Sequence, residues 1–145
     1  MGRAVRREAP GPMAETPAST LLFVNLHSSD LSDETLSSAS STLTAMASRV
    51  VLEITERASL DDVTDVRGKV AELRRLGFRM ALDDLGAGYA GLTSLAELEP
   101  EFVKLDISLV RDIHRNPVKQ KLVQSMIKMC REMGIQVIAE GIEVA

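Results

Sequence analysis

The sequence has few aromatic residues and a single cysteine. Of its 145 residues, 3% are aromatic and none is Trp, so a core must be built from Leu, Val, Ile, Met and Ala. One cysteine, Cys130, excludes an internal disulfide and suits a reducing compartment, and we therefore expect a cytoplasmic protein. Cys130 lies in an apolar helical pattern, which favours buried packing over reactivity.

Long apolar runs and an excess of positive charge are also missing. No run approaches the roughly 20 apolar residues of a membrane span, so we expect no membrane partner. The formal net charge is −4, which argues against a protein that coats a nucleic acid polymer or an anionic membrane. A phosphate ligand held through a cation is compatible with this charge.

Short apolar runs alternate with helical patterns along the chain. The apolar runs predict strands over 21–26, 50–54, 78–82, 101–105 and 135–139. The stretches between them predict helices over 59–76, 90–98 and 117–133, and a weaker helix over 31–46. This alternation indicates an α/β fold of parallel β/α units, as a sheet covered on both faces or as a closed barrel.

The first 20 residues differ in composition from the rest. They are rich in Pro, Ala, Gly and Arg and show no periodicity. We expect residues 1–20 to form a disordered tail or linker and residues 21–145 to form the domain.

Two adjacent carboxylates, Asp83 and Asp84, stand between an apolar run and a glycine-rich turn. Neighbouring carboxylates repel each other and are costly to desolvate, and a bound divalent cation removes that repulsion. The pattern favours a metal site at the end of a strand. The alternative is an exposed acidic turn, since Asp and Gly are ordinary turn residues.

A polar residue stands at the C-terminal end of each predicted strand. These residues are Asn25, Glu53, Asp83, Lys104 and Glu140. In parallel β/α architecture those strand ends share one face, where binding and catalytic sites are built. The repetition favours one shared site over five separate polar residues of the core.

The side chains in this set define a chemistry. Asn25, Glu53 and Asp83 offer oxygen ligands, which select Mg²⁺, Mn²⁺ or Ca²⁺. Asp84 allows a second metal with Asp83 as the bridge, and two metals suit in-line displacement at phosphorus.

Two further residues are candidates for the reaction itself. Lys104 can hold an attacking water or stabilise charge on a phosphoryl group, or it can form a simple ion pair with a neighbouring carboxylate. Glu140 is a candidate base or an outer ligand of the metals.

Several segments resemble the motifs of EAL-domain cyclic di-GMP phosphodiesterases. They are FVNLH (23–27), LEITE (52–56), DDLGAGYAGL (83–92), FVKLDISLV (102–110) and IAEGIE (138–143). Their order and spacing also agree with that family, and the resemblance covers about 21–143.

The resemblance implies a TIM-like barrel that hydrolyses cyclic di-GMP to pGpG with Mg²⁺ or Mn²⁺. By position, Asn25, Glu53 and Asp83 would bind the first metal, and Asp83 and Asp84 the second. The resemblance also implies roles for three other residues. Lys104 would contact the nucleophilic water, Glu140 would assist at the metals or as base, and Glu56 would stabilise the loop after Asp84. That loop would shape a homodimer interface.

The sequence departs from the family in two ways. It lacks the Glu-Ala-Leu motif, since neither Glu8 nor Glu15 is followed by Ala-Leu, and it ends before the family's last barrel strand. We therefore expect a partial barrel, with about five of eight β/α units, and impaired phosphodiesterase activity. The alternatives are a non-catalytic EAL remnant that binds a nucleotide or a protein partner, and a different metal-dependent β/α enzyme.

Overall fold

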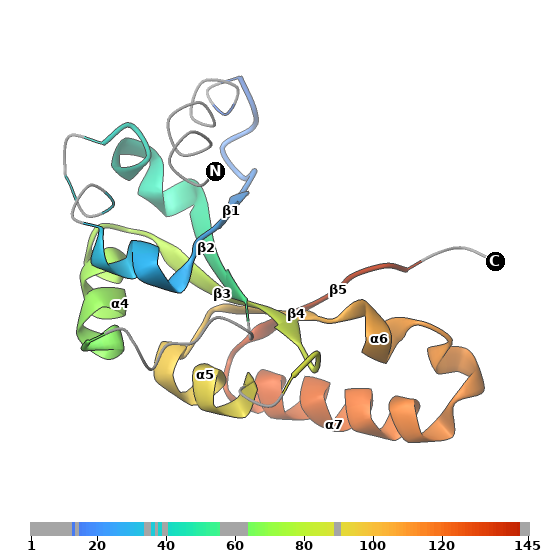
Figure 1. Cartoon of the computed structure of the whole chain (residues 1–145). Helices are drawn as coiled ribbons and strands as arrows, with labels where there is room; N and C mark the ends of the chain where they lie inside the picture. Colours follow the sequence, from blue (N-terminus) through green and yellow to red (C-terminus); the bar gives the residue numbers. More distant parts are fainter. Residues whose placement is uncertain are drawn as a thin grey trace. The chain divides into compact units, whose positions relative to one another are not determined.

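The computed structural model describes residues 13, 15–33, 36, 38, 41–55, 64–88 and 91–142 (Figure 1). The chain divides into two compact units, the first formed by Met1–Ile54 with Ala58–Met80 and the second by Thr55–Arg57 with Ala81–Ala145. The strands are β1 (Leu22–Asn25), β2 (Val50–Thr55), β3 (Arg79–Leu85), β4 (Phe102–Leu105) and β5 (Gln136–Ala139). The helices are α4 (Val66–Arg75), α5 (Gly91–Leu98), α6 (Ile107–Val110) and α7 (Pro117–Glu132), with 3-10 helices η1 (Ser28–Ser32), η2 (Thr44–Arg49) and η3 (Ile113–Arg115). Among the described helices, none has both the length and the hydropathy that crossing a bilayer requires.

The first unit is built on the parallel pair β1 and β2. Asn25 stands opposite Glu53 in their register, and the backbone N–H of Leu26 donates to the Glu53 carbonyl at 2.7 Å. Strand β2 is buried along nearly its whole length, which accounts for its continuous apolar sequence. Two polar residues, Asn25 and Glu53, therefore lie side by side on neighbouring strands.

Helix α4 shows how local sequence sets a boundary. Serine is a favourable helix cap, so the sequence predicts a cap at Ser59, which lies outside the described residues. The described helix begins after Asp65, whose carboxylate accepts from the Gly68 N–H at 3.0 Å. Val70 and Leu73 are buried on its inner face, as the periodicity predicts. Gly77 ends the turn with a φ of +103°, a conformation that glycine adopts at little cost.

The segment before β1 is held by one arginine. The guanidinium of Arg49 donates to the carbonyls of Met13, Pro17 and Thr20, at 3.2, 2.8 and 3.2 Å, and to the Thr16 hydroxyl at 2.6 Å. Met13 is buried. The described part of 1–20 thus packs on the first unit, and the domain boundary at residue 20 stays a prediction.

The weak helix expected over 31–46 is wrong as a continuous element. The structure instead has the short 3-10 helices η1 and η2, and residues 33, 38 and 41 between them are not helical. Ser and Thr side chains bond to nearby backbone groups and compete with a regular helix, and this stretch is rich in both.

The second unit is built on β4, which pairs in parallel with β3 and β5. Strand β3 is longer than predicted and contains Asp83 and Asp84, which we had expected just beyond its end. Its register with β4 shifts between Leu82 and Leu85. This irregularity is a β-bulge, and Asp83 and Asp84 lie within it.

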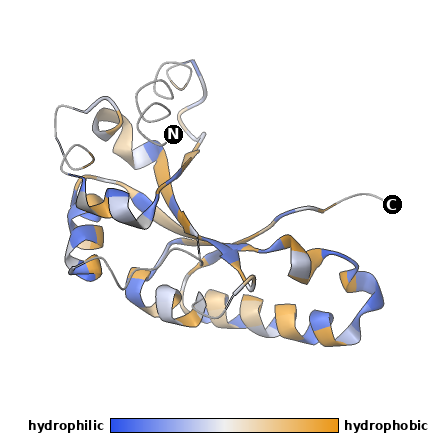
Figure 2. Cartoon of the chain, in the orientation of Figure 1, coloured by the Kyte–Doolittle hydropathy of each residue, from blue (hydrophilic) through white to orange (hydrophobic). Residues whose placement is uncertain are grey.

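Helix α7 follows an asparagine cap and carries Pro117 at its first position, as predicted. The spacing of the apolar residues predicts one inner face formed by Val118, Leu122, Ser125, Met126, Met129 and Met133, and this prediction is partly wrong. Val118 is 76% exposed and Leu122 and Met133 are also exposed, whereas Val123 and Cys130 are buried. Figure 2 shows hydrophobic and hydrophilic segments alternating along this helix. Apolar residues lie on more than one side of α7, so periodicity alone did not determine which side packs inward.

Candidate metal and phosphoryl-transfer site

The bulge in β3 sets the position of the two adjacent carboxylates. Asp84 has a φ of +58°, a left-handed conformation that is uncommon for a residue other than glycine. Its backbone N–H donates to Oδ1 of Asp83 at 2.9 Å. Bulges redirect side chains that a regular strand would place on opposite faces, and here Asp83 and Asp84 contribute to one cluster of acidic groups.

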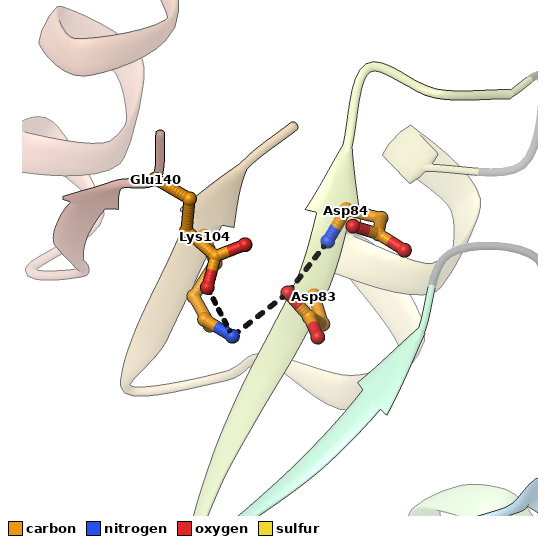
Figure 3. Close-up of polar contacts among 4 residues, drawn as sticks. All are labelled: Asp83, Asp84, Lys104 and Glu140. Carbon is orange, nitrogen blue, oxygen red and sulfur yellow. Dashed lines mark hydrogen bonds and ion pairs between the residues drawn. The ribbon is translucent and has the colours of Figure 1, made fainter. Parts of the chain in front are cut away.

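Lys104 joins two strands through its ammonium group. Nζ lies 3.1 Å from Oδ1 of Asp83 and 2.6 Å from Oε1 of Glu140. Figure 3 shows the lysine between the two carboxylates, with Asp84 beside Asp83. Lys104 is in β4, between β3 and β5, so parallel pairing of three strands brings these side chains together. Lys104 thus forms the ion pair that the sequence left open as the alternative to a role in the reaction, and its partners are two of the predicted site residues.

Three carboxylates meet at this place. One oxygen each of Asp83, Asp84 and Glu140 lie within 4.8 Å of one another. Asp83 is 9% exposed, and the other two are half-buried. The four side chains carry three negative charges and one positive charge, so the site attracts a further cation. The acidic pair is therefore not the exposed turn that the sequence left open as an alternative.

Asn25 and Glu53 lie in the first unit. Asn25 is the last residue of β1, whereas Glu53 lies two residues before the end of β2. The two stand opposite each other in the β1–β2 register, and Glu53 is 5% exposed. A carboxylate so deeply buried is rare in proteins, because removing its charge from water is expensive. Their role as metal ligands stays a prediction.

Other predicted roles are only partly visible. The family resemblance also implies supporting roles for Asp106 and Glu143 beside the metal ligands. Glu56 and Glu143 lie outside the described residues. Asp106 follows β4, and its carboxylate caps α6 by accepting from the Ser108 N–H at 2.8 Å. Asp106 N–H also donates to the carbonyl of Leu85. Gly86 and Gly141 both lie against α6, which the sequence did not predict. A glycine at a turn indicates the backbone conformation there, but it does not indicate which side chain lies beside it.

The geometry defines a class of protein: a parallel β/α domain with an acidic, lysine-containing site at the carboxyl ends of its strands. Comparison with known proteins agrees with this class. The family model for the EAL domain matches residues 1–145. The chain belongs to the EAL domain family.

Curated relatives are longer proteins. The chain is 37% identical over 94 residues to the cyclic di-GMP phosphodiesterase PdeR of Escherichia coli, covering 65% of this chain and 14% of that protein. It is 33% identical over 146 residues to a cyclic di-GMP phosphodiesterase of Pseudomonas aeruginosa, covering 96% of this chain and 25% of that protein. The chain thus spans a quarter or less of the length of these two relatives.

Solved structures share the fold. BlrP1 of Klebsiella pneumoniae, in a complex with calcium and cyclic di-GMP, matches 97% of this chain and 37% of that chain, at 32% identity and a TM-score of 0.85. The EAL domain of Mycobacterium smegmatis DcpA matches 99% of this chain and 68% of that chain, at 28% identity and a TM-score of 0.85. These matches confirm the predicted α/β class and the partial TIM-like (β/α) barrel.

Proposed function

We propose that this chain carries the metal-binding and reacting groups of a phosphodiesterase that hydrolyses cyclic di-GMP to pGpG. The single observation that supports the proposal most strongly is the cluster of Asp83, Asp84 and Glu140, in which Asp83 and Glu140 both contact the ammonium of Lys104. Solved relatives with this fold are complexes of cyclic di-GMP with calcium or manganese. The substrate is assigned from that relationship.

The donor set fits Mg²⁺ or Mn²⁺. Both ions prefer oxygen ligands, and carboxylates are the commonest of these in proteins. One oxygen each of Asp83, Asp84 and Glu140 lie within 4.8 Å of one another, so these three carboxylates could hold one ion. In the second unit, Asp83 and Asp84 would hold the metal. The ligand roles of Asn25 and Glu53, in the first unit, rest on the family resemblance alone. Bound divalent metal supplies charge neutralisation at phosphorus and lowers the pKa of a coordinated water.

Side chains of this chain would activate the attacking water and accept its proton. Lys104 donates to the attacking water or to a phosphoryl oxygen, and its two carboxylate contacts hold its ammonium in place for that role. Glu140 is half-buried and accepts the proton that the water loses as the new oxygen–phosphorus bond forms. The bond between phosphorus and the ribose 3′ oxygen breaks, and the 3′ oxygen leaves and takes up a proton. One water is consumed, and linear pGpG results.

The absence of a Glu-Ala-Leu sequence from the 145 residues favours a second candidate. In this alternative the chain binds cyclic di-GMP or a protein partner without turnover, because a metal ligand of the family is missing. We also propose a homodimer through the loop after Asp84, with Glu56 supporting that loop, and a cytoplasmic location. These proposals rest on the family resemblance and, for the location, on the single cysteine.

Turnover by the purified chain tests the proposal. Cyclic di-GMP is incubated with Mn²⁺ or Mg²⁺, and pGpG is measured by chromatography. We expect product that disappears with a chelator and with Asp83→Asn, while the exposed Asp112→Asn leaves it unchanged. Binding of cyclic di-GMP without product would support the non-catalytic alternative. Equal product from wild type and Asp83→Asn would refute the site.

A further inference from the structure

Helix α6 contacts the backbone next to both acidic segments of the site. A Cβ atom on Gly86 would overlap Cδ1 of Leu109 and lie 2.9 Å from its Cγ. A Cβ atom on Gly141 would lie 2.6 Å from Cγ1 of Ile107. Gly86 comes two residues after Asp84, and Gly141 directly follows Glu140. Two side chains of one short helix therefore pack against the backbone just after Asp84 and just after Glu140.

Both glycines also adopt backbone conformations that other residues avoid. The φ of Gly86 is +104° and that of Gly141 is +65°, so each position favours glycine through its backbone as well as through the lack of a Cβ. The backbone can approach α6 closely only because these positions lack a side chain.

Other contacts hold α6 itself in place. Its first turn is capped by Asp106, and the Asp106 N–H donates to the carbonyl of Leu85 at the end of β3. At its other end, Lys119 Nζ donates to the carbonyls of Ser108 and Arg111 at 2.6 and 3.0 Å. An isolated four-residue helix has almost no stability of its own, so these contacts to β3 and α7 determine where it lies.

We propose that Ile107 and Leu109 are positioning residues of the site. Leu109 sets the turn after Asp84, Ile107 sets the segment after Glu140, and together they hold the carboxylates at the separation that a metal requires. The inference rests on the proposed metal-dependent function. Metal ligands must be placed to within a few tenths of an ångström, so a small relaxation of either turn weakens binding without removing any ligand.

Affinity for Mn²⁺ alone, measured by titration calorimetry on the full chain, tests this role. We expect Ile107→Ala and Leu109→Ala each to weaken binding roughly 10-fold, the scale seen when groups that orient metal ligands are lost. The matched control is Leu122→Ala on α7, because Leu122 is 47% exposed and Ile107 is 37% exposed. The control should bind as wild type does. Equal affinities in all four proteins would overturn the proposal.

A second measurement works without metal. The Ala87 N–H donates to the Asp84 carbonyl at 3.0 Å within the turn that Leu109 contacts. We expect its hydrogen exchange, followed by NMR in metal-free protein, to be faster in Leu109→Ala than in Leu122→Ala. If wild type binds no Mn²⁺, the proposed function fails and this exchange rate decides the positioning role alone. Unchanged exchange in Leu109→Ala would then overturn it.

Discussion

The ammonium of Lys104 lies 3.1 Å from Oδ1 of Asp83, and the same nitrogen lies 2.6 Å from Glu140. The lysine therefore connects a carboxylate in β3 with one that follows β5. It places a positive charge among three acidic groups, where a divalent metal would also be attracted. This relationship makes the site sensitive to changes in charge, and the first two predictions follow from it.

Replacing Asp83 by asparagine should weaken Mn²⁺ binding by at least about 100-fold, because it removes a charged ligand from the centre of the cluster. The asparagine amide has nearly the same shape as the carboxylate, and its oxygen can still accept the hydrogen bond from the Asp84 N–H. We therefore expect the midpoint of urea unfolding in metal-free protein to change little. Calorimetric titration with Mn²⁺ checks the affinity, and Asp112→Asn serves as the control. Retained affinity in Asp83→Asn would exclude this residue as a ligand.

Replacing Lys104 by methionine should abolish turnover while leaving Mn²⁺ binding equal to or tighter than in wild type. The ammonium competes with the metal for Asp83 and Glu140, but the reaction needs its positive charge. In metal-free protein the remaining carboxylates repel one another, so the free energy of unfolding should fall by about 1 kcal/mol.

Urea unfolding with and without Mn²⁺ measures this change, and Mn²⁺ should restore the lost stability. The control is Lys128→Met, which removes an exposed ammonium 3.9 Å from Glu132. Weaker Mn²⁺ binding in Lys104→Met than in Lys128→Met would contradict the assignment of Lys104 as a competing cation.

Replacing Arg49 by methionine should lower the free energy of unfolding by about 1–2 kcal/mol, because four hydrogen bonds to residues 13–20 are lost. Circular dichroism in urea measures the loss, and Arg75→Met on the exposed side of α4 is the matched control. Equal stability of the two variants would show that residues 13–20 behave as the tail that the sequence predicts.

The thiol of Cys130 should react slowly with an aromatic disulfide reagent in native protein and rapidly in urea. The side chain is fully buried, and burial raises its pKa above 9.0, so the reactive thiolate is scarce. Above pH 9.0 the unfolded chain loses this proton before the folded chain does. The contribution of Cys130 to the free energy of unfolding should therefore fall as the pH rises past that value.

Urea titrations at pH 8 and pH 10 measure this fall, and Cys130→Ala should show a smaller one. Fast labelling of the native protein, at the rate found in urea, would contradict the buried position of the thiol.

Much of the fold follows from local patterns. Continuous apolar runs are typical of strands buried on both faces, and five such runs predicted β1 to β5 to within a few residues. Gly77 and Pro117 marked helix boundaries because their backbone preferences act over single residues. The polar residues at strand ends predicted a site, because parallel strands direct their carboxyl ends to a common edge.

The tertiary structure decided which neighbours those residues meet. The bulge that brings Asp83 and Asp84 into one cluster depends on pairing with β4, and the contacts of Lys104 depend on strands far apart in the sequence. The inner side of α7 and the contacts of α6 with Gly86 and Gly141 are likewise products of packing. By itself, the sequence determined the elements and the chemistry of the side chains, because these depend on local conformation and residue type. Distances between side chains depend on long-range packing, which no local pattern encodes.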